Sequence, residues 1–298
     1  MVLEVRRDPL KGVDVIVADE RSKRPRKKRA GCPFCKGNED LTPKTISAYP
    51  DEENWRVRRF NNVFPILKLG RKHFSWCNGH APAIGRHEVI VDTEKHSQAF
   101  QDYSREHLRL VWQGYKDAYA DLSSDNEAKV TFLMRNRGAS AGASIAHEHA
   151  QIISLPFVPI YLKNEAKKSK RGNCYFCNIR KKEEKLFETK NFVCVLPFNA
   201  RWECESWVVP KKHYKTLLDL TDEKGLEFLE AIQEALKRTD QFTPNYNIAF
   251  HCAPKGSDFH LHAEIYPRKE TWGAIELGLG VIVNVVSEKK AKKLLTRP

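Results

Sequence analysis

The sequence has no long uninterrupted run of apolar residues and only two methionines. None of its apolar stretches approaches the length that a membrane-spanning helix requires. The first residues, Met1 to Asp8, lack the pattern of a signal peptide, so we expect a cytoplasmic protein without a membrane partner. Hydrophobic residues make up 41% and charged residues 30% of the 298 positions, which suits a globular chain with one large or two medium domains.

The chain also has too few acidic residues to balance its basic ones, and its formal net charge is +13. Such a charge suits nucleic acid, but it equally suits phosphorylated sugars and nucleotides. The densest basic run, residues 21–29, can also be a solvated loop. A zinc-stabilised nucleic-acid-binding module is the non-enzymatic alternative. We expect no nucleic-acid partner, because the basic and aromatic ribbon typical of single-strand binders is missing.

Cysteine is not scarce, and its spacing indicates metal sites rather than disulfides in an intracellular chain. Four of the eight cysteines form two Cys-x-x-Cys pairs, Cys32/Cys35 and Cys174/Cys177. Two thiolates at this spacing can bind one tetrahedral ion, although a redox pair has the same spacing. The remaining four are expected to be small buried apolar residues: Cys77, Cys194, Cys204 and Cys252.

Residues 136–152 carry the pattern that points to chemistry. The first part is rich in glycine and small residues, which allow the backbone to approach a ligand and direct N–H groups at an anion. The second part alternates like a strand, which would place His147, His149 and Gln151 on one face beside a phosphate-sized cradle. A histidine there can attack phosphorus. Two surface histidines, or a metal-binding pair, are the alternative interpretations of His-x-His.

The chain repeats itself at a constant offset. Three pairs are each separated by 117 positions: Glu88 and Glu205, where strands are expected to begin, His96 and His213, and the expected helix caps Ser104 and Thr221. This common offset predicts two homologous halves, each with an antiparallel sheet and a helix. We place them at 1–155 (catalytic) and 156–298 (non-catalytic), with residues 156–173 as a linker. The second half lacks the glycine loop and has Glu264 where the first has Gln151.

The motif from Asn136 to Gln151, Asn-x-Gly-(x3)-Gly-x-Ser-(x2)-His-x-His-x-Gln, resembles the active-site signature of galactose-1-phosphate uridylyltransferases, a branch of the histidine-triad superfamily. That branch usually has proline between the two histidines, where this chain has Glu148, a feature shared with ADP-glucose phosphorylases. The resemblance implies an α+β fold with two tandem histidine-triad-like repeats. Their antiparallel sheets would form a half-barrel with flanking helices.

The same resemblance implies a function in galactose metabolism. His149 would take a uridylyl group from UDP-glucose or UDP-galactose and pass it to a hexose 1-phosphate such as galactose 1-phosphate, in a ping-pong reaction. The alternative keeps the histidine intermediate but makes the enzyme an ADP-glucose phosphorylase, an adenylyltransferase that uses inorganic phosphate. A hydrolase is less favoured, because water must be kept away from the intermediate.

Substrate-binding positions follow from the family pattern, residue by residue. A segment around Glu276 resembles the one that reads sugar hydroxyls across the interface of a dimer, so we expect a homodimer, although a glycine-rich turn between strands is the alternative. Asn284 is a weaker match there. The substrate-binding residues implied are Arg21, Arg24, Asn62, Val63, Phe64, Asn136, Gly142, Ser144, Gln151 and Glu276.

Two Cys2His2 sets fit closed structural zinc sites. The first set matches the family at all four positions, and the second follows the same order in the repeat. They are Cys32, Cys35, His96 and His147, and Cys174, Cys177, His213 and His260. A competing second metal site would use His251 and His262, but the carboxylate that it needs has no clear match in the sequence. We therefore expect two Zn²⁺ ions per chain on the Cys2His2 sets.

Overall fold

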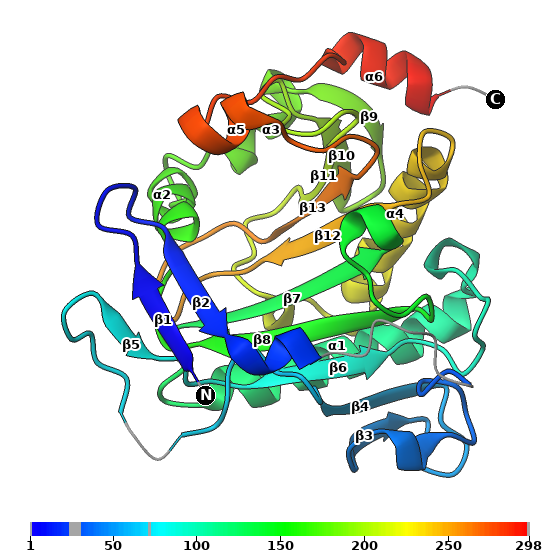
Figure 1. Cartoon of the computed structure of the whole chain (residues 1–298). Helices are drawn as coiled ribbons and strands as arrows, with labels where there is room; N and C mark the ends of the chain where they lie inside the picture. The colour runs from blue at the N-terminus through cyan, green and yellow to red at the C-terminus, as the bar shows by residue number, and fades with distance from the viewer. Residues whose placement is uncertain (1, 24–30, 71–72, 297–298) are drawn as a thin grey trace.

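The computed structural model describes residues 2–23, 31–70 and 73–296. A ten-stranded sheet forms the centre of the molecule (Figure 1), and all its neighbouring strands are antiparallel. In spatial order its strands are β3 (Thr45–Tyr49), β4 (Val57–Asn61), β6 (His87–Val91), β8 (His149–Leu155), β7 (Val130–Arg137), β12 (Tyr246–His251), β13 (His262–Pro267), β11 (Ser206–Pro210), β10 (Phe192–Leu196) and β9 (Glu184–Glu188). The sheet is open, and the fold is mixed α+β as expected.

The strand order reflects the repeat. From the centre outward, β7-β8-β6-β4-β3 on one side corresponds to β12-β13-β11-β10-β9 on the other, and the two sets join where β7 pairs with β12. This is the order that two tandem repeats with the same internal topology would produce. The boundary between residues 155 and 156 stays a prediction.

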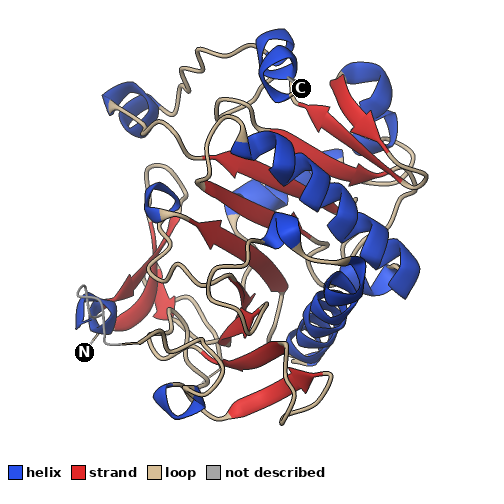
Figure 2. Cartoon of the chain, turned by 90° about the vertical axis from the view of Figure 1, so that its right-hand side faces the viewer, coloured by secondary structure: helices blue, strands red, loops and turns tan. Residues whose placement is uncertain are grey.

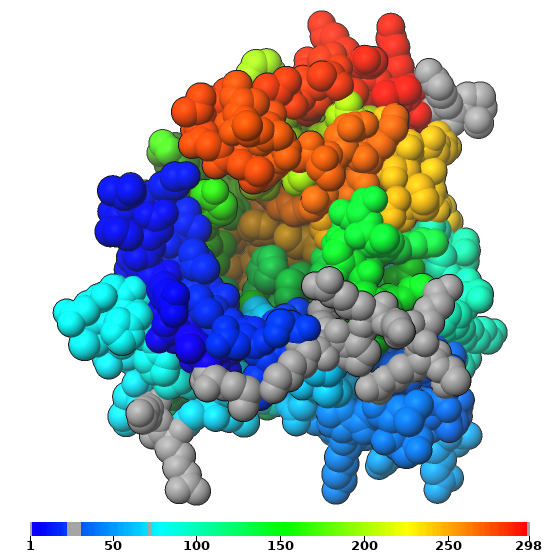
Figure 3. All heavy atoms as spheres, in the orientation of Figure 1, coloured from blue at the N-terminus to red at the C-terminus, as the bar shows by residue number. Residues whose placement is uncertain are grey.

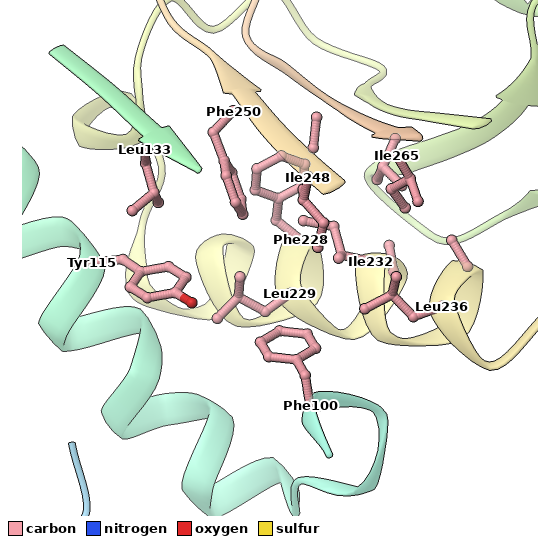
Figure 4. Close-up of a cluster of buried hydrophobic side chains, with 14 of the residues drawn as sticks. Phe100, Tyr115, Leu133, Phe228, Leu229, Ile232, Leu236, Ile248, Phe250 and Ile265 are labelled. Carbon is pink, nitrogen blue, oxygen red and sulfur yellow. The ribbon is translucent and has the colours of Figure 1, made fainter. Parts of the chain in front are cut away.

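Two long helices, α1 (Arg105–Ser124) and α4 (Asp222–Asp240), cover one face of this sheet (Figure 2). The expected caps are present, since Ser104 accepts from the backbone N–H of His107 and Thr221 from that of Lys224. The helices approach so closely that a Cβ on Gly225 would lie 1.9 Å from the Trp112 ring. A buried core fills the space between helices and strands, with Phe228, Leu229 and Ile232 of α4 packed against Ile248 and Phe250 of β12 (Figure 4).

Smaller elements surround the other face and the ends of the sheet. A three-stranded sheet, in the order β2-β1-β5, contains the N-terminal hairpin. These elements are β1 (Leu3–Arg7), β2 (Asp14–Ala18), β5 (His80–Pro82), α2 (Ile160–Lys168), α3 (Ile179–Lys182), α5 (Ala274–Leu279) and α6 (Glu288–Leu295). Within the described ranges, no helix is both long and apolar enough to cross a membrane.

Two sequence expectations are wrong in detail. The strand expected from His147 begins only at His149, because the chain before it bonds to the segment after β6: Asp92 donates its backbone N–H to the carbonyl of Glu148 at 3.2 Å. Cys77, expected to be a buried apolar residue, is exposed, whereas Cys194, Cys204 and Cys252 are buried. The expected linker, residues 156–173, contains helix α2, whose Leu162 packs into the cluster of Phe157 and its neighbours.

Candidate active site and metal-binding clusters

A small open pocket of about 120 Å³ lies beside the start of β8. In the space-filling view, the face opposite the long helices is hollowed between the blue N-terminal hairpin, the orange C-terminal segment and the green segment after β7 (Figure 3). Six of the expected site residues line the pocket together with four others. The lining is Arg21, Ile66, His87, Met134, Asn136, Gly142, Ala143, Ser144, His149 and Gln151.

The loop after β7 is shaped by glycine. Gly138 and Gly142 have φ angles of 84° and 76°, which residues with a Cβ rarely adopt, and a single 3-10 turn (Ala139–Ala141) lies between them. The N–H of Ala143 closes the loop by donating to the carbonyl of Gly138 at 3.1 Å. The chain thus bends back so that Gly142, Ala143 and Ser144 all face the pocket.

His149 stands at the first position of β8 and is almost completely buried. Its Nδ1 lies 2.8 Å from the carbonyl oxygen of His147, and a carbonyl only accepts. The proton of the neutral ring is therefore on Nδ1, and Nε2 carries the lone pair. The Phe34 ring, edge-on with its centroid 5.2 Å from that of His149, supports the imidazole from the side.

His87 on β6, which sequence reasoning missed, sets the orientation of Gln151. Its Nδ1 accepts from the backbone N–H of Ile66 at 3.1 Å, so its neutral ring carries the proton on Nε2. That N–H can donate only to an oxygen, and Oε1 of Gln151 lies 3.0 Å away. The amide nitrogen of Gln151 is then the atom left to donate to a ligand. A histidine at the start of a buried strand was the only signal in the sequence.

The expected substrate-binding loop of Asn62, Val63 and Phe64 lies next to these residues. Oδ1 of Asn62 accepts from the N–H of Phe64 at 2.9 Å. Nδ2 of Asn62 lies 3.1 Å from Nε2 of His87, but both nitrogens are donors in this tautomer and do not hydrogen-bond to each other. Arg21 donates to the carbonyl of Phe64 at 2.7 Å, which joins the basic segment to this loop. Val63 is exposed. Arg24 lies outside the described residues.

Glu276 is not among the pocket residues. It lies in α5, so the alternative of a turn between strands is wrong, and its carboxylate accepts from the N–H groups of Gly273 at 2.9 Å and Val283 at 3.2 Å. The weaker candidate, Asn284, donates to the carbonyls of Ala200 and Trp202. The segment exposes a row of apolar side chains: Ile275, Leu277, Leu279, Val281, Val283 and Val285.

The first Cys2His2 set is gathered in space. Nδ1 of His147 lies 3.7 Å from Sγ of Cys32 and 3.6 Å from that of Cys35, and Nδ1 of His96 lies 3.6 Å from Sγ of Cys35. A tetrahedral ion at usual bond lengths separates its sulfur and nitrogen ligands by roughly 3.5 Å. Nε2 of His147 donates to the carbonyl of Thr93 at 2.6 Å, so its lone pair is on Nδ1 and faces the thiols.

The second set has the same geometry. Sγ of Cys174 lies 3.4 Å from Nδ1 of His260, and Sγ of Cys177 lies 3.3 Å from Nδ1 of His213. The outer nitrogens again meet oxygens, of the Pro210 carbonyl for His260 and of a carboxylate for His213. Burial lowers the pKa of His260 to about 4, and burial raises the pKa of the Cys177 thiol to about 11. The imidazole is therefore ready to bind a cation, whereas the thiol must first lose its proton.

A third group corrects the expectation that the competing site lacks a carboxylate. Glu165 of α2 supplies it, with oxygens 2.9 Å from Nδ1 of His251 and 2.9 Å from Nε2 of His262. Burial alone would lower the pKa of His262, but Glu165 and Glu264 raise it to about 10. The second half therefore brings together the side chains of both candidate metal sites, the Cys2His2 set and the group around Glu165. Sequence analysis missed Glu165 because this residue lies in the expected linker.

Glu148 faces away from the pocket and is buried. Its carboxylate pairs with Arg135 and lies 3.4 Å from Arg137, while Arg135 also pairs with Asp92. Arg135 donates to the hydroxyl of Tyr115 on α1 at 2.6 Å. Two carboxylates around two guanidinium groups balance the charge beneath the histidines. Glu148, the charged residue between His147 and His149, therefore has a structural role in this buried ion-pair network.

Comparisons with known proteins agree with this geometry. The family model described as galactose-1-phosphate uridyl transferase, N-terminal domain, matches residues 4–159, and the C-terminal domain model matches residues 134–295. A galactose-1-phosphate uridylyltransferase of Thermotoga maritima is 29% identical, with 98% of each chain covered. An ADP-glucose phosphorylase of Arabidopsis thaliana is 27% identical, over 98% of this chain and 92% of that protein.

Solved structures show the same fold. A structure described as uridylyltransferase superposes with a TM-score of 0.82 at 26% identity, covering 98% of this chain and 97% of the other. The Arabidopsis thaliana ADP-glucose phosphorylase with bound ADP-glucose gives 0.80 at 26% identity, covering 100% and 99%. The matched family is one of nucleotidyltransferases. The chain belongs to the galactose-1-phosphate uridyl transferase family.

Proposed function

We propose that the protein is a UDP-glucose–hexose-1-phosphate uridylyltransferase that works by double displacement through a uridylyl group on His149. The hydrogen bond from Nδ1 of His149 to the carbonyl of His147 carries this proposal, because it leaves the lone pair on Nε2. The pocket beside that ring is lined by Asn136, Ser144 and Gln151, which can donate to phosphate oxygens.

In the first half-reaction, Nε2 of His149 attacks the α-phosphorus of the UDP-sugar. The N–P bond forms, the bond to the bridging oxygen of the sugar phosphate breaks, and hexose 1-phosphate leaves with the electron pair. In the second, an oxygen of another hexose 1-phosphate attacks the same phosphorus and His149 is released. Arg21 and the amide of Gln151 would balance the charge that develops at phosphorus.

We also propose Zn²⁺ at both Cys2His2 sets, supported by ligand spacing and by the oxygens that bind the outer nitrogens of His147, His213 and His260. An ion there would be structural, since all four positions are protein ligands. In the first set the ion would fix His147, whose backbone carbonyl orients the ring of His149. Four thiols that must stay reduced also support a cytoplasmic location.

A homodimer would complete the site. Glu276 lies outside the pocket of its own chain, and apolar side chains are exposed around it, which supports a contact with a second copy. In that arrangement Glu276 would reach the hexose bound to the partner subunit.

Intact-protein mass after incubation with UDP-glucose alone tests the proposal. We expect one uridylyl group per chain, released by galactose 1-phosphate as UDP-galactose. The control is ADP-glucose alone, with inorganic phosphate added afterwards to release any adenylyl group as ADP. An adduct from ADP-glucose but not from UDP-glucose would replace the proposal by a phosphorylase, and turnover with no adduct from either would exclude the histidine intermediate.

A further inference from the structure

The second half of the chain, which carries no nucleophile, reaches the active-site loop through Asn247. This residue lies on β12 directly opposite Asn136 on β7, where the two halves of the sheet join. Its Nδ2 is 2.6 Å from Oδ1 of Asn136 and 2.8 Å from the carbonyl of Ala141. Its Oδ1 lies 3.0 Å from Nη1 of Arg268.

Chemistry fixes which way each amide points. A guanidinium only donates, so the Asn247 atom that faces Arg268 must be the oxygen. The nitrogen of Asn247 then faces Asn136 and the carbonyl of Ala141, and each of its two hydrogens has an acceptor. Asn136 therefore presents its own oxygen to Asn247 and keeps its nitrogen for the pocket. An amide nitrogen donates to phosphate, whereas an amide oxygen would repel it.

We propose that Asn247, itself oriented by Arg268, is a positioning residue that aims the amide nitrogen of Asn136 at the substrate phosphate and fixes the loop of Gly138 to Gly142. The inference rests on the proposed function, because it assigns a phosphate to the pocket. It gives the second half a task at the phosphate although the proposed nucleophile, His149, lies in the first half.

The loop is restrained by the second half at a further point. Gly138 approaches the side chain of Asn245 so closely that a Cβ on the glycine would lie 1.8 Å from Oδ1 of that asparagine. Asn245 packs against the start of the loop, and Asn247 binds its end at Ala141. Asn245 and Asn247, both in the second half, thus contact the two ends of the turn that faces the pocket.

Arg268 extends the chain of contacts toward the C-terminal segment. Its guanidinium lies 4.0 Å from the ring centroid of Trp202, and Trp202 stacks on Trp272 with centroids 4.7 Å apart and planes 6° from parallel. Trp272 directly precedes Gly273, the cap of the helix that carries Glu276. Packed side chains thus connect that segment to Arg268, which binds Asn247.

Asn247→Ala tests the proposal in wild type and in an Asn136→Ala background. We expect the single variant to slow uridylyl transfer to His149 at saturating UDP-glucose by about 10- to 100-fold, as the loss of an oriented donor to a charged group does. In the Asn136→Ala background the same substitution should cost less than about threefold, because Asn247 acts mainly through Asn136. Arg268→Ala should change the rate in the same direction by a smaller factor.

Asn191→Ala and Arg238→Ala are the matched controls. Asn191 donates to Glu227, and Arg238 lies over the ring of Phe187, so both are interacting polar residues of the second half outside the pocket. They should leave the rate within about twofold. Equal losses for Asn247→Ala in both backgrounds, or wild-type rates with unchanged thermal stability, would overturn the inference.

Binding of UMP, measured by calorimetry, separates this inference from the proposed reaction. We expect Asn247→Ala to weaken UMP binding by about tenfold and Arg238→Ala to leave it unchanged. A wild type that binds UMP but forms no adduct would exclude the reaction while the UMP comparison still tests Asn247. UMP binding by Asn247→Ala that equals wild type would overturn the positioning role.

Discussion

The ring of His149 donates from Nδ1 to the backbone carbonyl of His147, while the ring of His147 donates from Nε2 to the carbonyl of Thr93. Two histidines two residues apart are thereby held in opposite tautomers. The lone pair of His147 is on Nδ1 beside two thiols, and that of His149 is on Nε2. One ring is suited to a metal ion and the other to attack on phosphorus.

The first prediction follows from this difference. His149→Gly should abolish formation of the uridylyl adduct, with kcat lowered by at least about 10⁴-fold, while metal content and folding persist. Free imidazole should restore part of the activity by filling the vacated space. His147→Ala should instead lose metal and thermal stability. Metal analysis with intact mass separates the two, and an adduct retained in His149→Gly would disprove the assignment.

The second prediction concerns the two Cys2His2 sets. The wild type should contain two zinc ions per chain, and Cys32→Ser and Cys174→Ser should each contain one, with a melting temperature lowered by about 10 °C or more. Cys32→Ser should also lose activity, because the lost ion no longer fixes His147, whose backbone carbonyl orients the ring of His149. Cys77→Ser is the control, since Cys77 is exposed and outside both sets. A wild type with one zinc ion would contradict one site.

Zinc affinity should also depend on pH in a defined direction. Burial raises the pKa of the thiols of Cys35 and Cys177, the latter to about 11. Zinc must displace these protons, so its affinity should increase with pH and ions should be lost first in acid. Competition with a chromogenic chelator over roughly pH 6 to pH 8 measures how zinc affinity changes with pH.

The third prediction tests His87. His87→Phe keeps a ring of similar size but cannot donate to Gln151, so the amide of Gln151 is free to turn over. We expect kcat/KM to fall by about 10-fold, and almost no further loss when the change is made in Gln151→Ala. His80→Phe, at an exposed position on β5, should be neutral. If the losses from His87→Phe and Gln151→Ala multiply in the double variant, His87 does not act through Gln151.

The fourth prediction concerns Glu148. Glu148→Gln should lower the free energy of unfolding by roughly 3 kcal/mol, because Arg135 and Arg137 lose a buried counter-charge. Glu188→Gln, which breaks a more exposed pairing with Lys185 and Lys211, should have a much smaller effect because solvent screens these charges. Denaturant titration of both variants checks this. Equal costs would mean that the buried network contributes no more than a surface pair.

The fifth prediction is a pH dependence of stability from His107. This side chain is buried with Nε2 2.6 Å from the carbonyl of Asp92, and burial lowers its pKa from 6.5 to about 4. The unfolded chain binds the proton first, so the contribution is fully present above pH 6.5 and is lost as the pH falls to about 4. Complete titration is worth on the order of 3 kcal/mol.

His107→Gln tests this sign. The variant should unfold with a weaker pH dependence between pH 6.5 and 4 than the wild type. His73→Gln, at a highly exposed side chain, should keep the wild-type dependence. Chemical denaturation at a series of pH values, with both proteins in the same buffer, provides the comparison. Parallel curves for His107→Gln and wild type would show that His107 does not titrate in this window.

Local patterns predicted much of the fold. The caps at Ser104 and Thr221, the strands around Glu88 and Glu205, and the repeat of a strand and a helix depend on residues close in the chain, and the structure contains each of them. The failures involve distant partners. His147 leaves the strand because its ring and its neighbour's carbonyl bond to the chain after β6, and no local rule describes such a bond.

The sequence by itself determined the class of chemistry and the candidate ligands, because motif spacing and the repeat are properties of the chain. Only the tertiary structure decided how those groups are oriented. The tautomer of His149, the amide of Gln151 set by His87, and the amide of Asn136 set by Asn247 all depend on which donor meets which acceptor across strands. Glu165 likewise joins His251 and His262 only when α2 brings it next to β12 and β13, since 86 positions separate Glu165 from His251.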